Sequence, residues 1–364
     1  MCQLFHILTN GGIVLGIFVI LLLNTKGVRK TRANVFLSVL LGALAFSTFH
    51  LRYAGDVINH FSVKTHSLGD PTFLLIAPLL WFYIVELTGG RIRFSISFLI
   101  HFIPFLLIAF FSVAFGSFLN DTSARAFLGD HPRLRFSVFW IVVAIQFWAY
   151  LYAIHKKWQG FQSLLRQEVS NTEDVSISWV RFFMGVFLAV SICLLFAVIA
   201  VIHLDATNWL WKAMGIVLSL SIFALGYKGI LQREIFYTIP PAEPVAENLY
   251  KPNQDLVEKL RAFMTDTKPY LDPELSLSSL SKKMGLTRNQ LSHLINAGLG
   301  ENFYDFINKY RVEEVKRLMA DPQKQNYNLL GIALEAGFKS KSTFNLIFKR
   351  FTGLTPTEYK KNIT

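Results

Sequence analysis

Residue types that carry out catalysis or bind metals are sparse in this chain of 364 residues. Its two cysteines, Cys2 and Cys193, are far apart and the second lies within an apolar run, so neither a disulfide framework nor a cysteine-based zinc site is expected. The sequence shows no His/Glu spacing typical of a metal site, no pairing of a nucleophile with a base and no glycine-rich phosphate loop. We therefore predict a protein that is not an enzyme and that uses no cofactor or metal.

Two ionisable residues in the apolar part of the chain, Glu86 and His101, are candidates for ligand sensing. An ionisable side chain in lipid is costly unless it is paired, so such a residue is a functional candidate by default. Each of the two lies near the end of its apolar run, where the side chain can reach the interface. A structural role therefore competes with the sensing role.

The remaining chemistry is hydrogen bonding from short helices near the C-terminus. Leu277 and Leu280 have the spacing of one helix face, and Gly285 marks a turn before the next helix. The same layout returns around Gly337, and a longer helix over about 302–319 is expected to join the two halves. Two helix-turn-helix units joined in this way can place two helices in successive major grooves, about 34 Å apart.

At these positions the chain resembles the AraC/XylS family of transcription regulators. The resemblance is carried by residues 275–295, 303–311 and, above all, 336–359, where the family signature is matched in spacing and residue type. It covers about the last 90 residues. It implies a double helix-turn-helix DNA-binding domain, a role as transcription activator, RNA polymerase as a partner, and an N-terminal part that senses a signal.

The resemblance also assigns DNA contacts by matching positions. Asn289, Ser292 and His293 take positions that face bases in the family, whereas Lys339, Lys349 and Arg350 suit phosphates. Many relatives have Arg where this chain has Leu346, which can touch a thymine methyl but cannot make the bidentate contact with guanine. The full predicted set is Arg288, Asn289, Gln290, Ser292, His293, Lys339, Ser340, Lys341, Ser342, Asn345, Leu346, Lys349 and Arg350.

The part of the chain that precedes this domain is predicted to span a membrane. The chain is 52% hydrophobic and contains 34 phenylalanines, which is too apolar for an ordinary soluble protein. A hydrocarbon core requires about 20 apolar residues per helix. Runs near that length are Leu4–Leu23, Asn34–Tyr53, Pro71–Leu87, Ile96–Phe115, Phe136–Ile154, Trp179–Leu204 and Trp209–Tyr227.

Basic residues in the short loops predict the orientation, because they concentrate on the cytoplasmic side. Odd-numbered loops carry Lys26, Arg29, Lys30, Arg32, Arg91, Arg93, Lys156, Lys157 and Arg166, whereas even-numbered loops carry Arg52, Lys64, Arg125, Arg133 and Arg135. Odd loops are therefore inside. Seven crossings then place the N-terminus outside and everything after Tyr227 in the cytoplasm, the side on which chromosomal DNA lies.

The sequence thus predicts an all-α protein. A polytopic seven-helix membrane domain is expected over residues 1–230, a proline-containing linker with a short amphipathic helix over 231–270, and an AraC-type DNA-binding domain over 271–364. We expect a multi-pass protein of a bacterial inner (cytoplasmic) membrane whose partners are double-stranded DNA, the lipid bilayer, an unknown signal ligand and a second copy of the chain.

Two other interpretations of the sequence stay open. One is a membrane transporter or enzyme with an attached regulatory helical domain. The other is a helical protein-interaction module that does not bind DNA. The basic balance does not separate them from the regulator, because the net charge of +12 suits an anionic membrane surface as well as nucleic acid.

Overall fold

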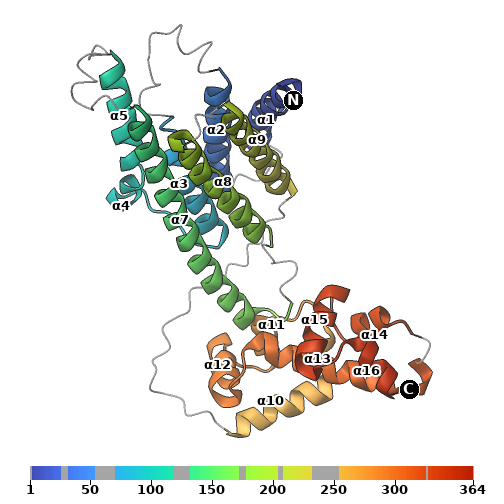
Figure 1. Cartoon of the computed structure of the whole chain (residues 1–364). Coiled ribbons are helices and arrows are strands. Elements are labelled where there is room, and N and C mark those ends of the chain that lie inside the picture. The colour runs from blue at the N-terminus through green and yellow to red at the C-terminus, as the bar shows by residue number, and fades with distance from the viewer. Residues whose placement is uncertain are drawn as a thin grey trace. The chain divides into compact units, whose positions relative to one another are not determined.

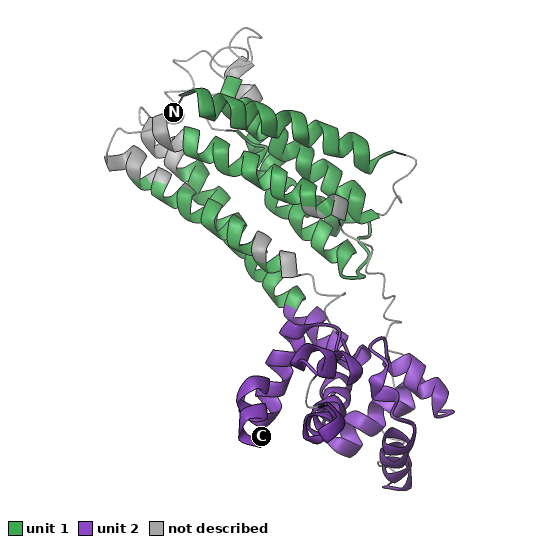
Figure 2. Ribbon diagram, turned by 90° about the vertical axis from the view of Figure 1, so that its right-hand side faces the viewer, with its two compact units in different colours: residues 1–158, 177–236 green, residues 159–176, 237–364 purple. Residues whose placement is uncertain are grey.

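The computed structural model describes residues 2–25, 32–53, 70–117, 132–171, 178–203, 208–231, 254–324 and 327–363. Over these ranges the elements are helices (Figure 1), and the prediction of an all-α fold is confirmed there. The chain forms two compact units (Figure 2): unit 1 comprises residues 1–158 and 177–236, and unit 2 comprises residues 159–176 and 237–364. Most of the predicted linker lies outside the described residues, as do five of the basic loop residues used for the orientation, Lys26, Arg29, Lys30, Lys64 and Arg125.

Unit 1 is a bundle in which α2 packs against α1, α3 and α9, and α1 packs against α9. Its helices are α1 (Cys2–Leu23), α2 (Arg32–Tyr53), α3 (Phe73–Leu87), α4 (Ile96–Ile100), α5 (Ile103–Ser117), α7 (Pro132–Glu168, which continues into unit 2), α8 (Ser178–His203) and α9 (Asn208–Leu231).

Small residues let α1 and α9 approach closely. A Cβ atom added to Gly12 would lie 2.7 Å from Cβ of Ser219, and one added to Gly226 would lie 3.0 Å from Cγ2 of Val19. Neither position has room for a larger side chain without a shift of the neighbouring helix. Glycine and serine at such contacts are typical of helix packing in membranes, where helices associate through close van der Waals contact.

Three helical segments of the described chain are long and apolar enough to cross a membrane: Gln3–Leu23, Arg32–Tyr53 and Val138–Glu168. Large apolar side chains on these segments point away from the unit's core; Val14 is 67% exposed and Ile145 is 64% exposed. By contrast, α3 has 15 residues and is about 22 Å long, shorter than the roughly 30 Å hydrocarbon core. Seven crossings therefore exceed what helix length and composition establish here.

Two predicted spans differ from the observed helices. The run Ile96–Phe115 is broken at His101 and Phe102 into α4 and α5. Pro104 explains the break, because it has no N–H to donate and, in a continuous helix, its ring would clash with the carbonyl group of Ile100, four residues earlier. The fifth helix is longer than its predicted run of Phe136–Ile154, since α7 continues to Glu168.

The extension of α7 follows a helical spacing of apolar residues. Ile154, Trp158, Phe161 and Leu165 recur every three or four residues and are all buried. Polar residues separate them, and for that reason the hydropathy of the sequence ended the helix too early. The end of α7 is therefore an amphipathic helix whose apolar stripe packs inside the protein.

Unit 2 has two hydrophobic cores that share one helix. The first core gathers residues of α10, α11, α12 and the start of α13, and the second gathers the rest of α13 with α14 and α15. Ile307 of α13 lies in the first core and Val315 in the second, so this helix joins the two halves rigidly. The helices are α10 (Gln254–Thr267), α11 (Leu277–Lys283), α12 (Arg288–His293), α13 (Phe303–Ala320), α14 (Leu329–Glu335), α15 (Lys341–Thr352) and α16 (Pro356–Ile363), with short turns η3 (Pro269–Leu271), η4 (Leu294–Gly298) and η5 (Pro322–Lys324).

Candidate nucleic-acid interface

The first helix-turn-helix consists of α11, a turn and α12. Ser276 begins α11, where its Oγ accepts a hydrogen bond from the backbone N–H of Ser279 at 3.2 Å. Gly285 turns the chain with a φ of +67°, which costs glycine little. Thr287 and Gln290 then cap α12 reciprocally: Thr287 Oγ1 accepts from the Gln290 N–H at 3.2 Å, and Gln290 Oε1 accepts from the Thr287 N–H at 2.9 Å.

The second helix-turn-helix, α14 and α15, repeats this construction. Asn328 caps α14 by accepting from the Gly331 N–H at 2.6 Å, and Ser340 caps α15 by accepting from the Thr343 N–H at 3.3 Å. Gly337 makes the turn with a φ of +91°, and an added Cβ would clash with the carbonyl oxygen of Tyr270. Only glycine fits there, because both the backbone angle and the contact exclude a side chain.

On the first predicted recognition helix, α12, most of the expected DNA contacts are half-buried. This holds for Arg288, Asn289, Ser292 and His293, whereas Gln290 is exposed but takes part in the cap described above. Ser292 Oγ also accepts a hydrogen bond from Asn296 at 3.3 Å.

Arg288, the first residue of α12, is paired with a carboxylate that sequence reasoning did not single out. Its Nε donates to Glu168 Oε2 at 2.9 Å, and its Nη2 donates to Glu168 Oε1. The hydrogen bonds that Arg288 donates to Glu168 raise the pKa of Arg288, so the guanidinium is charged at any physiological pH. Glu168 is separated from Arg288 by 120 positions, and no local pattern in the sequence connects them.

On the second predicted recognition helix, α15, the expected contacts are open to solvent. The exposed members of the set are Lys341, Ser342, Asn345, Leu346, Lys349 and Arg350, while Lys339 and Ser340, just before the helix, are half-buried. Lys339 forms an ion pair with Glu274, and Arg350 forms one with Asp305. Leu346 is 69% exposed, so this apolar side chain is accessible to a ligand.

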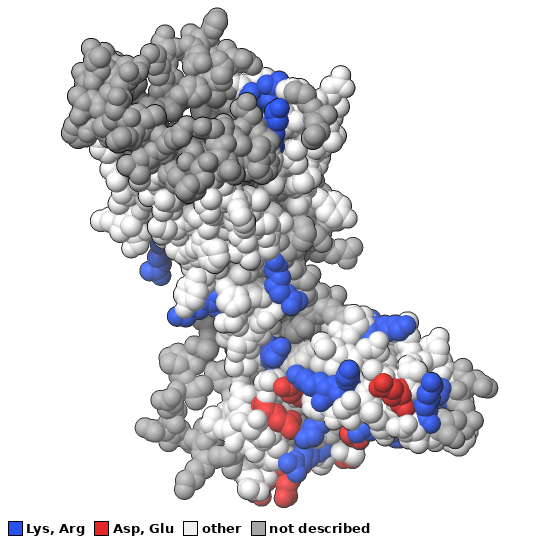
Figure 3. Space-filling model, viewed as in Figure 1, with Lys and Arg blue, Asp and Glu red and all other residues white. Residues whose placement is uncertain are grey.

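Basic and acidic side chains alternate over unit 2, whereas the described face of unit 1 in Figure 3 is largely uncharged. Residues 251–364 hold 18 Lys and Arg against 12 Asp and Glu, a balance of +6. An excess of this size suits the attraction of phosphates without forming a single-sign field.

A buried carboxylate on α13 organises the centre of unit 2. Glu314 accepts hydrogen bonds from Arg317 Nη2 at 2.7 Å and from Lys268 Nζ at 3.3 Å. The bond from Arg317 and the weaker one from Lys268 hold the pKa of Glu314 below its usual range, although burial acts in the opposite direction. Burial and the charge of Glu314 raise the pKa of the neighbouring Tyr270 to about 12.

Arg311, also on α13, is the largest fully buried side chain among the described residues. Within that part of the chain, its hydrogen bonds go to carbonyl and hydroxyl oxygens and not to a carboxylate. It donates to the carbonyl oxygens of Tyr270 and Asp272, each at 2.8 Å, and to that of Ser170 at 3.1 Å. Burial lowers its pKa to about 10. The sequence placed Arg311 on the joining helix but gave no sign of this role.

In unit 1, the two candidate sensing residues have partners. Glu86 is buried, accepts from the Ile92 N–H at 2.7 Å and lies 3.2 Å from Arg32 Nη2, so it ties the start of α2 to the segment after α3. His101 Nδ1 forms a hydrogen bond with the hydroxyl of Tyr150.

Besides Glu86, unit 1 holds another buried ionisable group, which the sequence did not single out. Asp70 is 4% exposed, accepts from the hydroxyl of Thr72 at 2.6 Å and lies 3.8 Å from His50. The available signal was an acidic residue directly before an apolar run.

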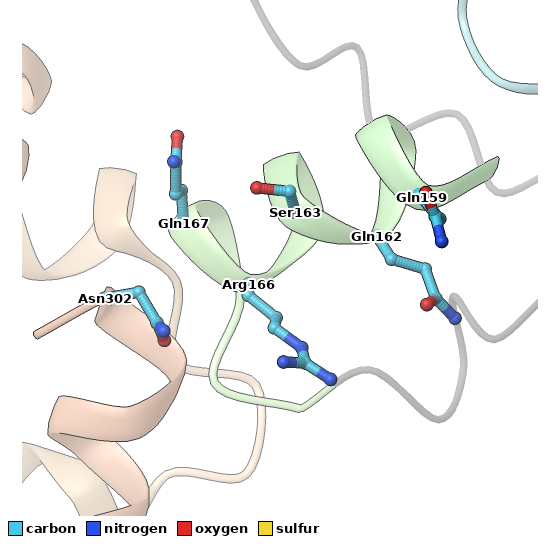
Figure 4. Close-up of a pocket in the computed structure, with 6 residues that line it drawn as sticks. All are labelled: Gln159, Gln162, Ser163, Arg166, Gln167 and Asn302. Carbon is cyan, nitrogen blue, oxygen red and sulfur yellow. The ribbon is translucent and has the colours of Figure 1, made fainter. Parts of the chain in front are cut away.

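The end of α7 lines a polar cavity of 330 Å³ within unit 2 (Figure 4). Its lining residues are Gln159, Gln162, Ser163, Arg166, Gln167 and Asn302. Across the described ranges, no group of three or more His, Cys, Asp or Glu side chains is arranged to hold a metal ion.

Comparison with known proteins supports the helix-turn-helix interpretation of the C-terminal part. Residues 280–362 match the family model described as a helix-turn-helix domain. The chain is 32% identical over 113 residues to an uncharacterized HTH-type transcriptional regulator of Staphylococcus aureus (strain COL), which covers 30% of this chain and 15% of that protein. It is 29% identical over 106 residues to the "Probable transcriptional regulator LumQ" of Photobacterium leiognathi, covering 29% of this chain and 42% of that protein.

A solved structure of a protein of unknown function from Listeria innocua is 28% identical and covers 30% of this chain and 98% of its own, with a TM-score of 0.27. The match covers 15% and 42% of the lengths of the two curated relatives, less than half of each. The prediction of a C-terminal helix-turn-helix domain is confirmed.

Proposed function

We propose that this protein is a membrane-embedded regulator of transcription that binds DNA sequence-specifically through two helix-turn-helix units. The observation that carries the proposal is the pair of capped helices α12 and α15, held by the single helix α13 that runs through both cores of unit 2. Such a pair can enter successive major grooves on one face of a duplex. The names of the two similar curated proteins, both transcriptional regulators, support the same function.

The DNA contacts are assigned to the predicted set on α12 and α15, with one change of emphasis. Gln290 and Ser340 serve as capping residues, so their main contribution is to fix the start of each recognition helix. Asn345 and Lys341 are exposed on α15 and read base edges, and Leu346 contacts a thymine methyl. We propose activation of transcription, with RNA polymerase as the partner, from the family resemblance.

The membrane part of the proposal is a seven-helix domain over residues 1–230 with its N-terminus outside, a linker over 231–270 and a cytoplasmic DNA-binding domain over 271–364. The three long apolar segments and the close glycine contacts between α1 and α9 support insertion in the inner membrane. This domain is the sensor of an unknown signal ligand and the site of homodimerisation. His101, with Tyr150, is the better candidate for sensing, because Glu86 is used in an ion pair with Arg32.

The test is selection from a pool of random DNA duplexes by the full-length protein in lipid nanodiscs, followed by sequencing and a salt titration. We expect enrichment of a bipartite site whose halves lie about one helical turn apart, with binding that weakens steeply as salt increases. If duplexes were retained without enrichment of any sequence, or if the affinity did not change with salt concentration, the proposal would be contradicted. Either result would favour a protein-interaction module instead.

A further inference from the structure

The end of α7 and the three residues after it, residues 165–171, are an integral part of unit 2, and we call them the docking segment. In Figure 1 the end of α7 lies beside α11. Leu165, Val169 and Ser170 are 3%, 4% and 1% exposed. Val169 forms an antiparallel bridge with Ser276, and the N–H and hydroxyl of Ser170 donate to the carbonyl oxygen of Leu275 at 3.2 and 2.7 Å.

The docking segment also satisfies polar groups buried in unit 2. The Ser170 carbonyl oxygen accepts from Asn308 Nδ2 at 3.2 Å and from Arg311 Nη1 at 3.1 Å. Arg311 Nη2 donates to Ser170 Oγ at 3.0 Å. A buried donor without an acceptor is costly, so these bonds hold the segment in a defined register on α13.

That register places Glu168 on Arg288, the first residue of the first recognition helix. The side chains of Arg288 and Glu168 are only 20% and 13% exposed, and the carboxylate meets the guanidinium through two of its donors. A carboxylate and a phosphate both accept hydrogen bonds from the same edge of a guanidinium. Arg288 therefore cannot present its Nε and Nη2 donors to DNA while Glu168 occupies them.

The two recognition helices differ in this respect. Lys341, Asn345 and Lys349 on α15 are exposed, whereas Arg288 on α12 is covered by a carboxylate from the docking segment. The first four residues of the segment, 165–168, are the end of α7, the helix that contains the candidate membrane span Val138–Glu168.

From these contacts we infer that the docking segment is a built-in inhibitor of the first helix-turn-helix, because Glu168 occupies the Nε and Nη2 donors with which Arg288 would bind a phosphate. The inference rests on the proposed DNA-binding function. Release of the segment frees Arg288 for the DNA backbone and adds the contribution of α12 to that of α15. Because α7 carries the segment, a change in the membrane part of this helix regulates DNA binding through Glu168.

The experiment compares full-length wild type, Glu168→Gln, Arg288→Ala and the double variant in nanodiscs, using the duplex that wild type enriches from the random pool. Glu301→Gln is the matched control, because it removes one negative charge from another ion pair of unit 2, with Lys309. We expect Glu168→Gln to bind about threefold to tenfold more tightly, with a salt dependence steeper by about one released counterion. Arg288→Ala should change wild-type binding little but abolish the gain in the double variant.

A gain no larger than that of Glu301→Gln, weaker binding by Glu168→Gln, or a gain that persists without Arg288 would each overturn the inference. A second measurement needs no substitution. Adding the duplex to wild type should speed hydrogen exchange of the Ser170 amide, which the bond to Leu275 protects. Unchanged or slower exchange in the DNA complex would show that the segment stays docked, and the inference would be wrong.

Failure of the proposed function gives a different result. Asn345→Ala lies in the second helix-turn-helix, on α15, whereas Glu168 pairs with Arg288 in the first. If this variant loses sequence preference while Glu168→Gln equals wild type, DNA binding stands and only the inhibition is wrong. If no duplex is enriched and no variant changes retention, both proposals are overturned.

Discussion

Among the DNA contacts proposed for α15, we expect Asn345 to contribute most to base reading, because its amide can both donate and accept hydrogen bonds whereas the neighbouring Leu346 can do neither. Asn345→Ala removes an exposed amide from α15 without touching the core. We expect a loss of about 1 to 3 kcal/mol in discrimination at one base pair, with little change in affinity for unrelated duplexes. Competition binding against single-base variants of the enriched site measures it. Asn362→Ala removes an exposed amide from α16 and should leave discrimination unchanged; equal effects would refute the contact.

Glu314 gives unit 2 a stability that depends on pH. Its pKa is lower in the folded state than in the unfolded chain, so its contribution is fully present above the unfolded value and is lost as the pH falls through the folded value. Glu314→Gln should therefore lower the free energy of unfolding by about 1 to 2 kcal/mol at neutral pH. The difference from wild type should shrink in acid.

Hydrogen exchange of α13 amides measures this difference at each pH. Glu313→Gln is the control, because Glu313 is 64% exposed and pairs only with the neighbouring Lys316 among the ion pairs of the described chain. A penalty for Glu314→Gln that stays constant from neutral pH into acid would argue against a depressed pKa.

At the scale of elements, the turn between α14 and α15 depends on Gly337 for two reasons that can be separated. Gly337→Ala adds both the cost of a positive φ and a clash with the Tyr270 carbonyl oxygen. Gly353→Ala adds only the first, because nothing lies within 4 Å of its added Cβ. Gly353→Ala should cost about 1 kcal/mol of unfolding free energy and Gly337→Ala at least about 2 kcal/mol more. Equal losses in hydrogen-exchange stability would mean that the turn relaxes.

The contact between α1 and α9 provides the corresponding test in unit 1. Gly12→Ala forces a Cβ to 2.7 Å from Ser219, whereas Gly185→Ala on α8 meets nothing within 4 Å. We expect Gly12→Ala to destabilise unit 1 by about 1 to 3 kcal/mol, because overpacking shifts one helix from the other. Gly185→Ala should be neutral or slightly stabilising. Denaturation in mixed micelles compares the two, and a neutral Gly12→Ala would show that the helices separate at little cost.

The elements also show what the sequence could and could not predict. Caps and turn glycines at Thr287, Gly285 and Gly337 lie within a few residues of the helices they define, so the helix-turn-helix layout was readable locally. The break before Pro104 was likewise readable from a single residue. The C-terminal end of α7 was missed. Polar residues lower the mean hydropathy after Ile154, although the buried apolar residues continue through Trp158 and Leu165.

Long-range contacts were beyond any local pattern. The bond from Arg311 to Ser170 joins positions 141 residues apart, and both residue types are ordinary at their places in the sequence. Burial of an arginine with carbonyl and hydroxyl acceptors depends on how three segments pack, which periodicity does not encode. The predicted DNA contacts on α15 could be placed from sequence, but the engagement of Arg288 by Glu168 could not.

At the scale of the whole molecule, the orientation in the membrane is testable directly. We replace Cys2 and Cys193 by Ser and introduce single cysteines in place of Lys64 and Lys156. The excess of basic residues in odd loops places Lys64 outside and Lys156 inside. A membrane-impermeant maleimide should label Lys64→Cys in intact cells and Lys156→Cys only after permeabilisation. The reverse pattern would place the helix-turn-helix domain away from DNA.

The two stretches of unit 2 also restrict the path of the chain between them. Residues 159–176 and 237–364 fold into one body, and residues 177–236, with α8 and α9, belong to the other. In the proposed membrane-embedded protein, a folded body lies on one side of the bilayer, so the intervening chain must cross it an even number of times. Helices α8 and α9 therefore insert as a pair or not at all. During synthesis Ser170 leaves the ribosome before Arg311 exists, so we expect unit 2 to complete its core only after the whole of α8 and α9 has been made.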